Sequence, residues 1–93
     1  MASVKSIKKD IDYLVSEVIS DSYLTIYFHP EKKEKAVEVM EAAVALRNQL
    51  VVKANNPAEK NNPHLVKRHY GQLRRELLEG VDGLFQKISE ICK

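Results

Sequence analysis

The sequence predicts an all-α fold, an antiparallel up-down bundle of three long helices, and two observations lead to this prediction. Apolar residues recur at alternating intervals of three and four along most of the 93 residues, as they do on one face of an α-helix. Breaks that contain proline fall at two places, His29-Pro30 and the asparagine-rich segment 55–63. We therefore expect one helical-bundle domain, 1–93, with helices over about 3–28, 31–54 and 64–92.

The first helix is predicted by an apolar stripe that follows Ser3, a suitable N-cap. The members of the stripe are Val4, Ile7, Ile11, Leu14 and Val18. Segment 23–28 is rich in aromatic and β-branched residues and by composition could form a strand. No second segment of that kind exists to pair with it, so we assign it to the last turns of the helix. Pro30 ends the helix, because the residue before a proline avoids the α region.

The second helix is expected to begin at Glu31, directly after Pro30. Proline fits the first turn of a helix, and an acidic residue is favourable there. Its apolar lines consist of Ala36, Val39, Met40, Ala43, Leu46 and Leu50. The small alanines would let a neighbouring helix approach closely.

The third helix carries a long apolar row. The row consists of Val66, Tyr70, Leu73, Leu77, Leu84, Ile88 and Ile91, with Gly80 at one core position. Gly71 and Gly83 also fall in this helix, although each glycine costs about 1 kcal/mol relative to alanine. Close packing against a neighbouring helix would explain the glycines. The alternative is a kink or break at Gly80–Gly83, with Asp82 capping a short fourth helix.

Composition excludes several classes of protein. The formal charge of +2 is too small to indicate nucleic-acid binding by itself. The longest uninterrupted apolar run, Ala42–Leu46, is far shorter than the roughly 18 residues of a membrane span. The single cysteine, Cys92, cannot form an internal disulfide, which is typical of a reducing compartment. We therefore expect a soluble cytoplasmic protein.

No motif predicts catalysis, a cofactor or a metal. A zinc site lacks cysteines, and His64 and His69 are five residues apart, on roughly opposite sides of a helix. The chain has no Glu-x-x-His pair for a di-metal site and no glycine-rich phosphate loop. We therefore expect a protein that is not an enzyme.

One short motif resembles a known family. The sequence His64-Leu65-Val66-Lys67 resembles the His-x-x-Lys core of histidine phosphotransfer domains, which are also helical bundles. The resemblance covers four residues and implies that His64 would accept a phosphoryl group and Lys67 would contact it. In that family a glycine usually follows the lysine and the histidine lies in mid-helix, whereas Arg68 follows here and His64 stands at a predicted helix start.

Basic residues concentrate where three helix ends should meet. Short connections make consecutive helices antiparallel, which brings segment 53–75 and the start of the first helix to one end of the molecule. Glu59 is the only acidic residue from Lys53 to Arg75. We name as the basic end Lys53, Lys60, Lys67, Arg68, Arg74 and Arg75. With the positive ends of two helix dipoles, it predicts a site for RNA or DNA phosphates. The alternative is a solvated, charged helix face.

Most of the six aromatic residues should gather at the opposite end. We name as the aromatic end Tyr23, Tyr27, Phe28 and Phe85. These side chains either close the core at that end of the bundle or form an exposed patch that docks a protein partner, since exposed apolar patches mark interfaces.

Helices this long in so short a chain share a thin core with much lateral surface. Such a rod can complete its burial by pairing with a second copy, so a homodimer is predicted. We therefore expect a non-enzymatic interaction protein, which acts as a homo-oligomer or docks a protein partner. The alternative is an RNA- or DNA-binding accessory protein that uses the basic end. A histidine phosphotransfer-like bundle is the third hypothesis.

Overall fold

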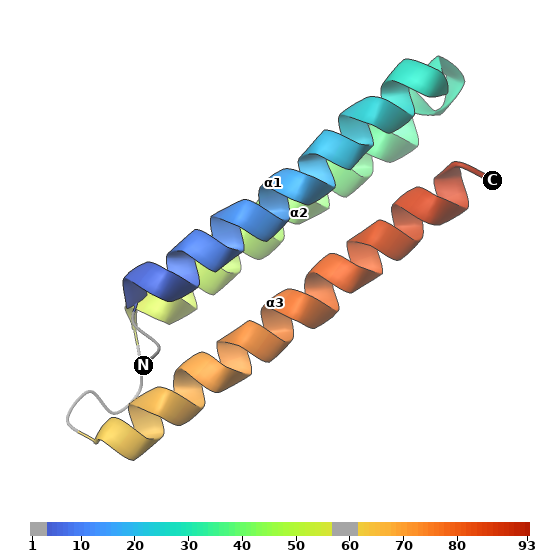
Figure 1. The fold of residues 1–93 in the computed structure, drawn as a ribbon. Coiled ribbons are helices and arrows are strands. Elements are labelled where there is room, and N and C mark those ends of the chain that lie inside the picture. The colour runs from blue at the N-terminus through green and yellow to red at the C-terminus, as the bar shows by residue number, and fades with distance from the viewer. Residues whose placement is uncertain (1–3, 57–61) are drawn as a thin grey trace.

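The computed structural model describes residues 4–56 and 62–93, and this part of the chain contains helices and no strand. Three α-helices pack against one another: α1 (Val4–Phe28), α2 (Lys33–Asn55) and α3 (Pro63–Ile91). In Figure 1, α1 and α3 run in one direction and α2 runs in the opposite one. The predicted antiparallel three-helix bundle is therefore confirmed.

Helix α1 buries one face along its length. The buried side chains are Ile7, Ile11, Val15, Val18, Ser22 and Thr25. The hydroxyls of Ser22 and Thr25 donate to backbone carbonyls four residues earlier in the helix, which satisfies both buried donors. Segment 23–28 is helical, as predicted, because the bundle offers it a helical packing partner and no strand to pair with. The N-cap predicted at Ser3 lies outside the described residues.

The turn between α1 and α2 differs from the prediction. Pro30–Lys32 form a 3-10 turn, η1, and α2 begins only at Lys33, whereas the sequence predicted a regular helix from Glu31. A single tight turn at a helix N-terminus is common, and here the backbone N–H of Lys32 donates to the carbonyl of His29. The turn also contacts α3, because the Lys32 ammonium donates to the carbonyl of Ile91.

Helix α3 is continuous from Pro63 to Ile91, so the alternative of a break at Gly80–Gly83 is wrong. Gly80 lies against α2: a Cβ at this position would stand 2.8 Å from Cδ2 of Leu46. Close packing therefore explains Gly80. It does not explain Gly71 and Gly83, where an added Cβ would meet nothing within 4 Å.

The core is a narrow column of side chains between the three helices. From α2 and α3 it takes Ala36, Val39, Ala43, Leu50, Ala54, Tyr70, Leu73, Leu77, Val81, Leu84 and Ile88. Five residues predicted for core rows are only partly buried: Leu14, Met40, Leu46, Val66 and Ile91. Val81 was missing from the predicted row and is buried. The whole forms a rod of 51 × 18 × 17 Å.

Candidate interaction surfaces

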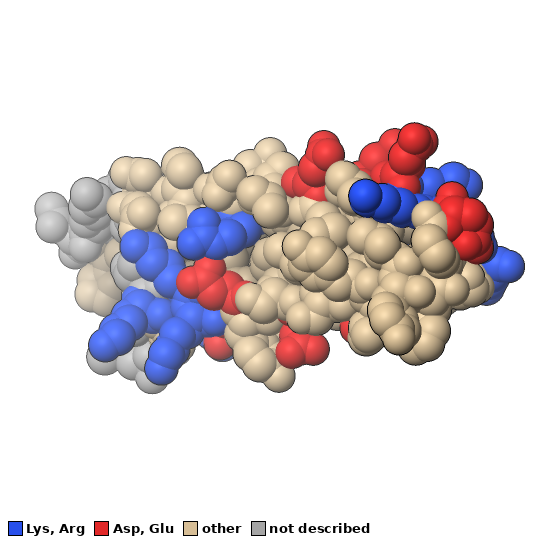
Figure 2. All heavy atoms as spheres, turned by 90° about the horizontal axis from the view of Figure 1, so that it is seen from above, with Lys and Arg blue, Asp and Glu red and all other residues tan. Residues whose placement is uncertain are grey.

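The basic end lies where the start of α1, the end of α2 and the start of α3 come together. Lys60 lies outside the described residues. The other five members are exposed: Lys53, Lys67, Arg68, Arg74 and Arg75. Figure 2 shows Lys and Arg side chains gathered at this end of the rod, beside the residues drawn in grey.

Two of these five cations are neutralised by acids from other helices. Lys53 Nζ lies 3.1 Å from Glu76 Oε2. Arg74 Nη2 lies 2.7 Å from Asp10 Oδ2. Among the described residues, Lys67, Arg68 and Arg75 form no ion pair. The cationic surface at this end is therefore smaller than the sequence count of basic residues indicates.

The start of α3 does not offer the free backbone N–H groups expected for a phosphate site. Asn62 Oδ1 accepts hydrogen bonds from the backbone N–H groups of His64 and Leu65 at 3.1 and 3.3 Å. Tyr70 is buried with its hydroxyl 3.5 Å from the carbonyl of Ala54, so its ring cannot stack on a base. At the start of α3, an anion would therefore be held mainly by side chains.

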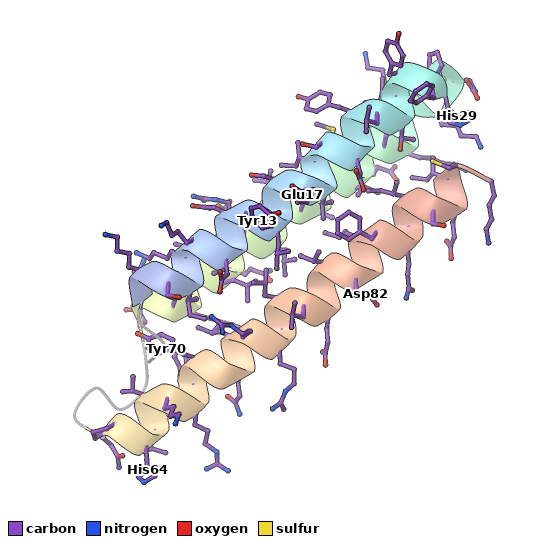
Figure 3. The ribbon with its side chains drawn as sticks, viewed as in Figure 1. Tyr13, Glu17, His29, His64, Tyr70 and Asp82 are labelled. Atoms are coloured by element: carbon purple, nitrogen blue, oxygen red, sulfur yellow. The ribbon has the colours of Figure 1, made fainter. Side chains whose placement is uncertain are left out.

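The His-x-x-Lys motif lies on the first turns of α3. His64 is at the tip of the helix in Figure 3, and its side chain is exposed. Together with Leu65, Lys67 and Arg68 it lines a shallow hollow of about 400 Å³. The structure thus brings His64 and Lys67 together, but at a helix start rather than in mid-helix.

The aromatic end is exposed at three of its four positions. Tyr23, Tyr27 and Phe28 expose 61%, 77% and 68% of their surface. Phe85 is half-buried and packs against the core. Of the two interpretations left open by the sequence, closure of the core therefore applies to Phe85, and an exposed patch describes the three residues from α1.

Local contacts explain why these three side chains stay outside. In the same turns, Ser22 and Thr25 are the residues that lie on the buried face of α1. Tyr27 and Phe28 contact each other edge to face, with ring centroids 5.1 Å apart. Leu24 lies beside them and is 55% exposed, and we did not single it out from the sequence. Its spacing of three from Tyr27 could have identified it.

A second site that the sequence analysis missed lies in the groove between α1 and α3. Tyr13 is 65% exposed, and Leu78 is also exposed. Both border a hollow of about 250 Å³ that is also lined by Leu14, Leu77 and the Asp10–Arg74 ion pair. Figure 3 places Tyr13 and Glu17 along the middle of α1. Exposed apolar surface on α1 thus extends well beyond the aromatic end.

Two further reactive side chains, Cys92 and His29, lie near the turn between α1 and α2. The Cys92 thiol is free, exposed and 3.6 Å from Thr25 Oγ1. His29 Nδ1 lies 3.5 Å from Glu31 Oε1 on the neighbouring turn. Cys92 therefore lies beside a hydroxyl group, and His29 lies beside a carboxylate.

Comparisons of the chain with protein-family models, with curated proteins and with solved structures found no match. In the part of the chain that the structure describes, no helix is long and apolar enough to cross a bilayer. The candidate interaction surfaces are the two ends of the rod and the outer face of α1.

Proposed function

We propose that the protein is a non-enzymatic interaction module that docks a protein surface onto its aromatic end. The observation that carries this proposal is the exposure of Tyr23, Tyr27 and Phe28 on consecutive turns of one helix. We also propose a cytoplasmic location, on the ground that the lone Cys92 has no partner in the chain for a disulfide.

The physical argument rests on what these side chains gain from a partner. Large aromatic side chains dominate interface energetics, and Tyr is enriched among the residues that contribute most to binding. Burying one fully is worth roughly 1.5–3 kcal/mol relative to leaving it exposed. Leu24 adds a fourth apolar side chain next to the three aromatic ones. A contiguous patch of this kind is typical of an interaction site rather than of scattered surface residues.

A homodimer is one form that this docking would take. The core of the rod is narrow, and several bulky side chains of α1 remain outside it. Association with a second copy would bury them without any further protein. The partner can equally be a different protein, and the same residues would then carry the contact.

The test replaces Tyr27 or Phe28 with glutamate. We expect each variant to remain helical, because both side chains are exposed, and to lose either its dimeric mass or its protein partner. The measurements are circular dichroism, light scattering and capture of bound proteins by the tagged chain. The matched control is Val52→Glu, which puts the same charge on an exposed apolar position of α2. Folded Tyr27→Glu protein with unchanged mass and unchanged partners would contradict the proposal.

A second candidate function is RNA or DNA binding at the basic end. It is supported by Lys67, Arg68 and Arg75, which are exposed and form no ion pair among the described residues. Labelled RNA and duplex DNA should then bind with an affinity that falls steeply between ~50 and ~200 mM salt. Arg68→Glu with Arg75→Glu should abolish the binding. Lack of binding at the lower salt concentration would leave these residues as a solvated charge cluster.

A further inference from the structure

The outer side of the first half of α3 carries two arginines with a glycine between them. Arg68, Gly71 and Arg75 are spaced three and four residues apart, which places them on one side of the helix. All three are exposed, on the side of α3 that faces away from α1 and α2 (Figure 1). Neither arginine forms an ion pair among the described residues, so both guanidinium groups are open to a ligand.

Gly71 is not explained by the packing of the bundle. A Cβ added at this position would meet nothing within 4 Å. Glycine in a helix interior lowers stability relative to alanine, and here it provides no packing contact that would offset the loss. Glycine is useful at such a position where a second backbone has to approach closely. Gly71 therefore forms a notch between two cationic side chains that are about 10.5 Å apart along the helix axis.

We propose that the notch at Gly71 receives the sugar-phosphate backbone of a nucleic-acid duplex. The inference rests on the second candidate function, RNA or DNA binding, and names its ligand. One strand of the duplex crosses α3 at Gly71, and Arg68 and Arg75 donate hydrogen bonds to phosphates on either side of the crossing. Lys67 is exposed next to Arg68, forms no ion pair among the described residues and contacts a third phosphate.

The aromatic residues near this face favour a duplex over a single strand. Proteins that bind single strands stack the bases on aromatic side chains. In the described part of the chain, no exposed tyrosine or phenylalanine lies on this side of α3, because Tyr70 is buried. The exposed Tyr13 lies in the groove between α1 and α3 instead. A duplex keeps its bases stacked inside and presents its phosphates outward, so cations and a notch are sufficient to hold it.

The charges that follow along α3 favour a narrow ligand over a broad one. Glu79 and Asp82 follow Arg75 at spacings of four and three, on the same side of the helix, and both are exposed. A membrane of anionic lipids would meet these carboxylates together with the arginines. A strand that crosses the helix at Gly71 contacts the arginines and leaves both carboxylates outside the contact.

Three phosphate contacts set the salt dependence that we expect. The logarithm of the affinity should fall with the logarithm of the salt concentration at a slope of about −2.7, at about −0.9 for each contact. The affinity for a duplex should therefore fall roughly 40-fold between ~50 and ~200 mM salt. Contacts to phosphates carry no sequence information, so two duplexes of unrelated sequence should bind equally well.

The experiment compares one substitution at two glycines of α3 by the anisotropy of labelled DNA and RNA duplexes. Gly71→Leu fills the notch without changing the charge, and leucine favours the helix. We expect roughly tenfold weaker binding and a salt slope closer to about −0.9, because the strand no longer reaches both arginines. The matched control is Gly83→Leu, where an added Cβ also meets nothing within 4 Å. Gly83→Leu should bind like the wild type, and equal affinities of the two variants would overturn the proposal.

Further measurements separate failure of this inference from failure of the second candidate function. If Arg68→Glu with Arg75→Glu abolishes binding but Gly71→Leu does not weaken it, the notch is overturned and nucleic-acid binding stands. Tighter binding of a single strand, or of phosphatidylserine vesicles, than of the duplex overturns the duplex as the ligand. No binding of duplex or single strand at ~50 mM salt overturns both, and the proposed docking at the aromatic end is then unaffected. Circular dichroism of each variant checks that it is folded.

Discussion

Gly80 is a residue at which α3 packs closely against α2. Its missing Cβ leaves room for the Leu46 side chain of α2, whose methyl carbons would lie 2.8 and 3.0 Å from an added Cβ. Gly71, nine residues earlier in the same helix, has open space where a Cβ would be. The two positions therefore separate the intrinsic cost of glycine in a helix from its value in packing.

We predict opposite effects of one substitution at these two glycines. Gly80→Val should lower the free energy of unfolding by about 1–3 kcal/mol, because the added methyl groups displace Leu46 and strain the contact between α2 and α3. Gly71→Val should leave it unchanged or raise it by a few tenths of a kcal/mol, through better helix propensity. Urea unfolding followed by circular dichroism measures both.

A third variant checks the cause of the Gly80 effect. Adding Leu46→Ala to Gly80→Val removes the side chain that the valine displaces. The double variant should therefore lose less stability than the sum of the single ones. Additive losses would show that Leu46 is not the contact that requires glycine.

At the scale of the element, the start of α3 depends on a single capping side chain. Asn62 accepts from the backbone N–H groups of His64 and Leu65, and Pro63 follows it at the first helical position. No other side chain among the described residues takes these two donors. The first turn of α3, with His64 and Lys67, is held in helical form largely by this cap.

Replacing the cap should loosen that turn. We expect Asn62→Ala to lower the free energy of unfolding by about 1 kcal/mol and to speed hydrogen exchange of the first amides of α3. Asn62→Asp keeps an acceptor at the same position and should stay close to the wild type. If Asn62→Ala and Asn62→Asp exchange equally fast, the side-chain cap does not hold the turn.

The elements themselves were largely predictable from the sequence. The three-four spacing of apolar residues gave the three helices, and Pro30 and Pro63 gave their limits to within a few residues. The assignment of single core positions was less accurate. Leu14 was predicted for the core but is half-buried, whereas Val81 was overlooked and is buried. The spacing of apolar residues indicates the approximate buried side of a helix. Which residues stand at the centre of that side depends on where the two neighbouring helices lie.

The candidate surfaces were predictable as regions but not in detail. The ion pairs Arg74–Asp10 and Lys53–Glu76 join residues far apart in the sequence, so their neutralising effect follows only from the packing of helices. The sequence alone does not decide whether the Tyr27 side chain is exposed or buried. Aromatic residues at this end of the bundle fit both a closed core and an exposed patch. The exposed Tyr13 beside Leu78 follows from the packing of α1 against α3 and not from the apolar stripe of α1.

At the scale of the whole molecule, the rod is extended for its length. Its radius of gyration is 15.2 Å, against about 12 Å for a compact domain of this size. An elongated single chain buries less of its apolar surface than a sphere would. Stability should therefore depend on any association that covers the side of the rod.

A homodimer makes the melting temperature depend on protein concentration. We expect the melting temperature to rise by a few degrees for each roughly tenfold increase in concentration, because association stabilises the folded chain by mass action. Tyr27→Glu should remove this dependence, whereas Val52→Glu should preserve it. Differential scanning calorimetry over a wide concentration range provides the measurement. A wild-type melting temperature that is constant over that range would contradict dimerisation.

The contacts at the turn end have a consequence for how the chain reaches its fold during synthesis. The Lys32 ammonium donates to the carbonyl of Ile91, and the Thr25 hydroxyl contacts the Cys92 thiol. The hairpin formed by α1 and α2 is therefore completed by contacts with the end of α3, which is synthesised last. Until α3 emerges, α1 and α2 can pair only with each other and leave Val39 and Ala43 without their full cover. From the completion of α2 at Asn55 until α3 docks, the nascent hairpin therefore exposes this apolar surface, and chaperone binding is expected to fall once α3 has docked.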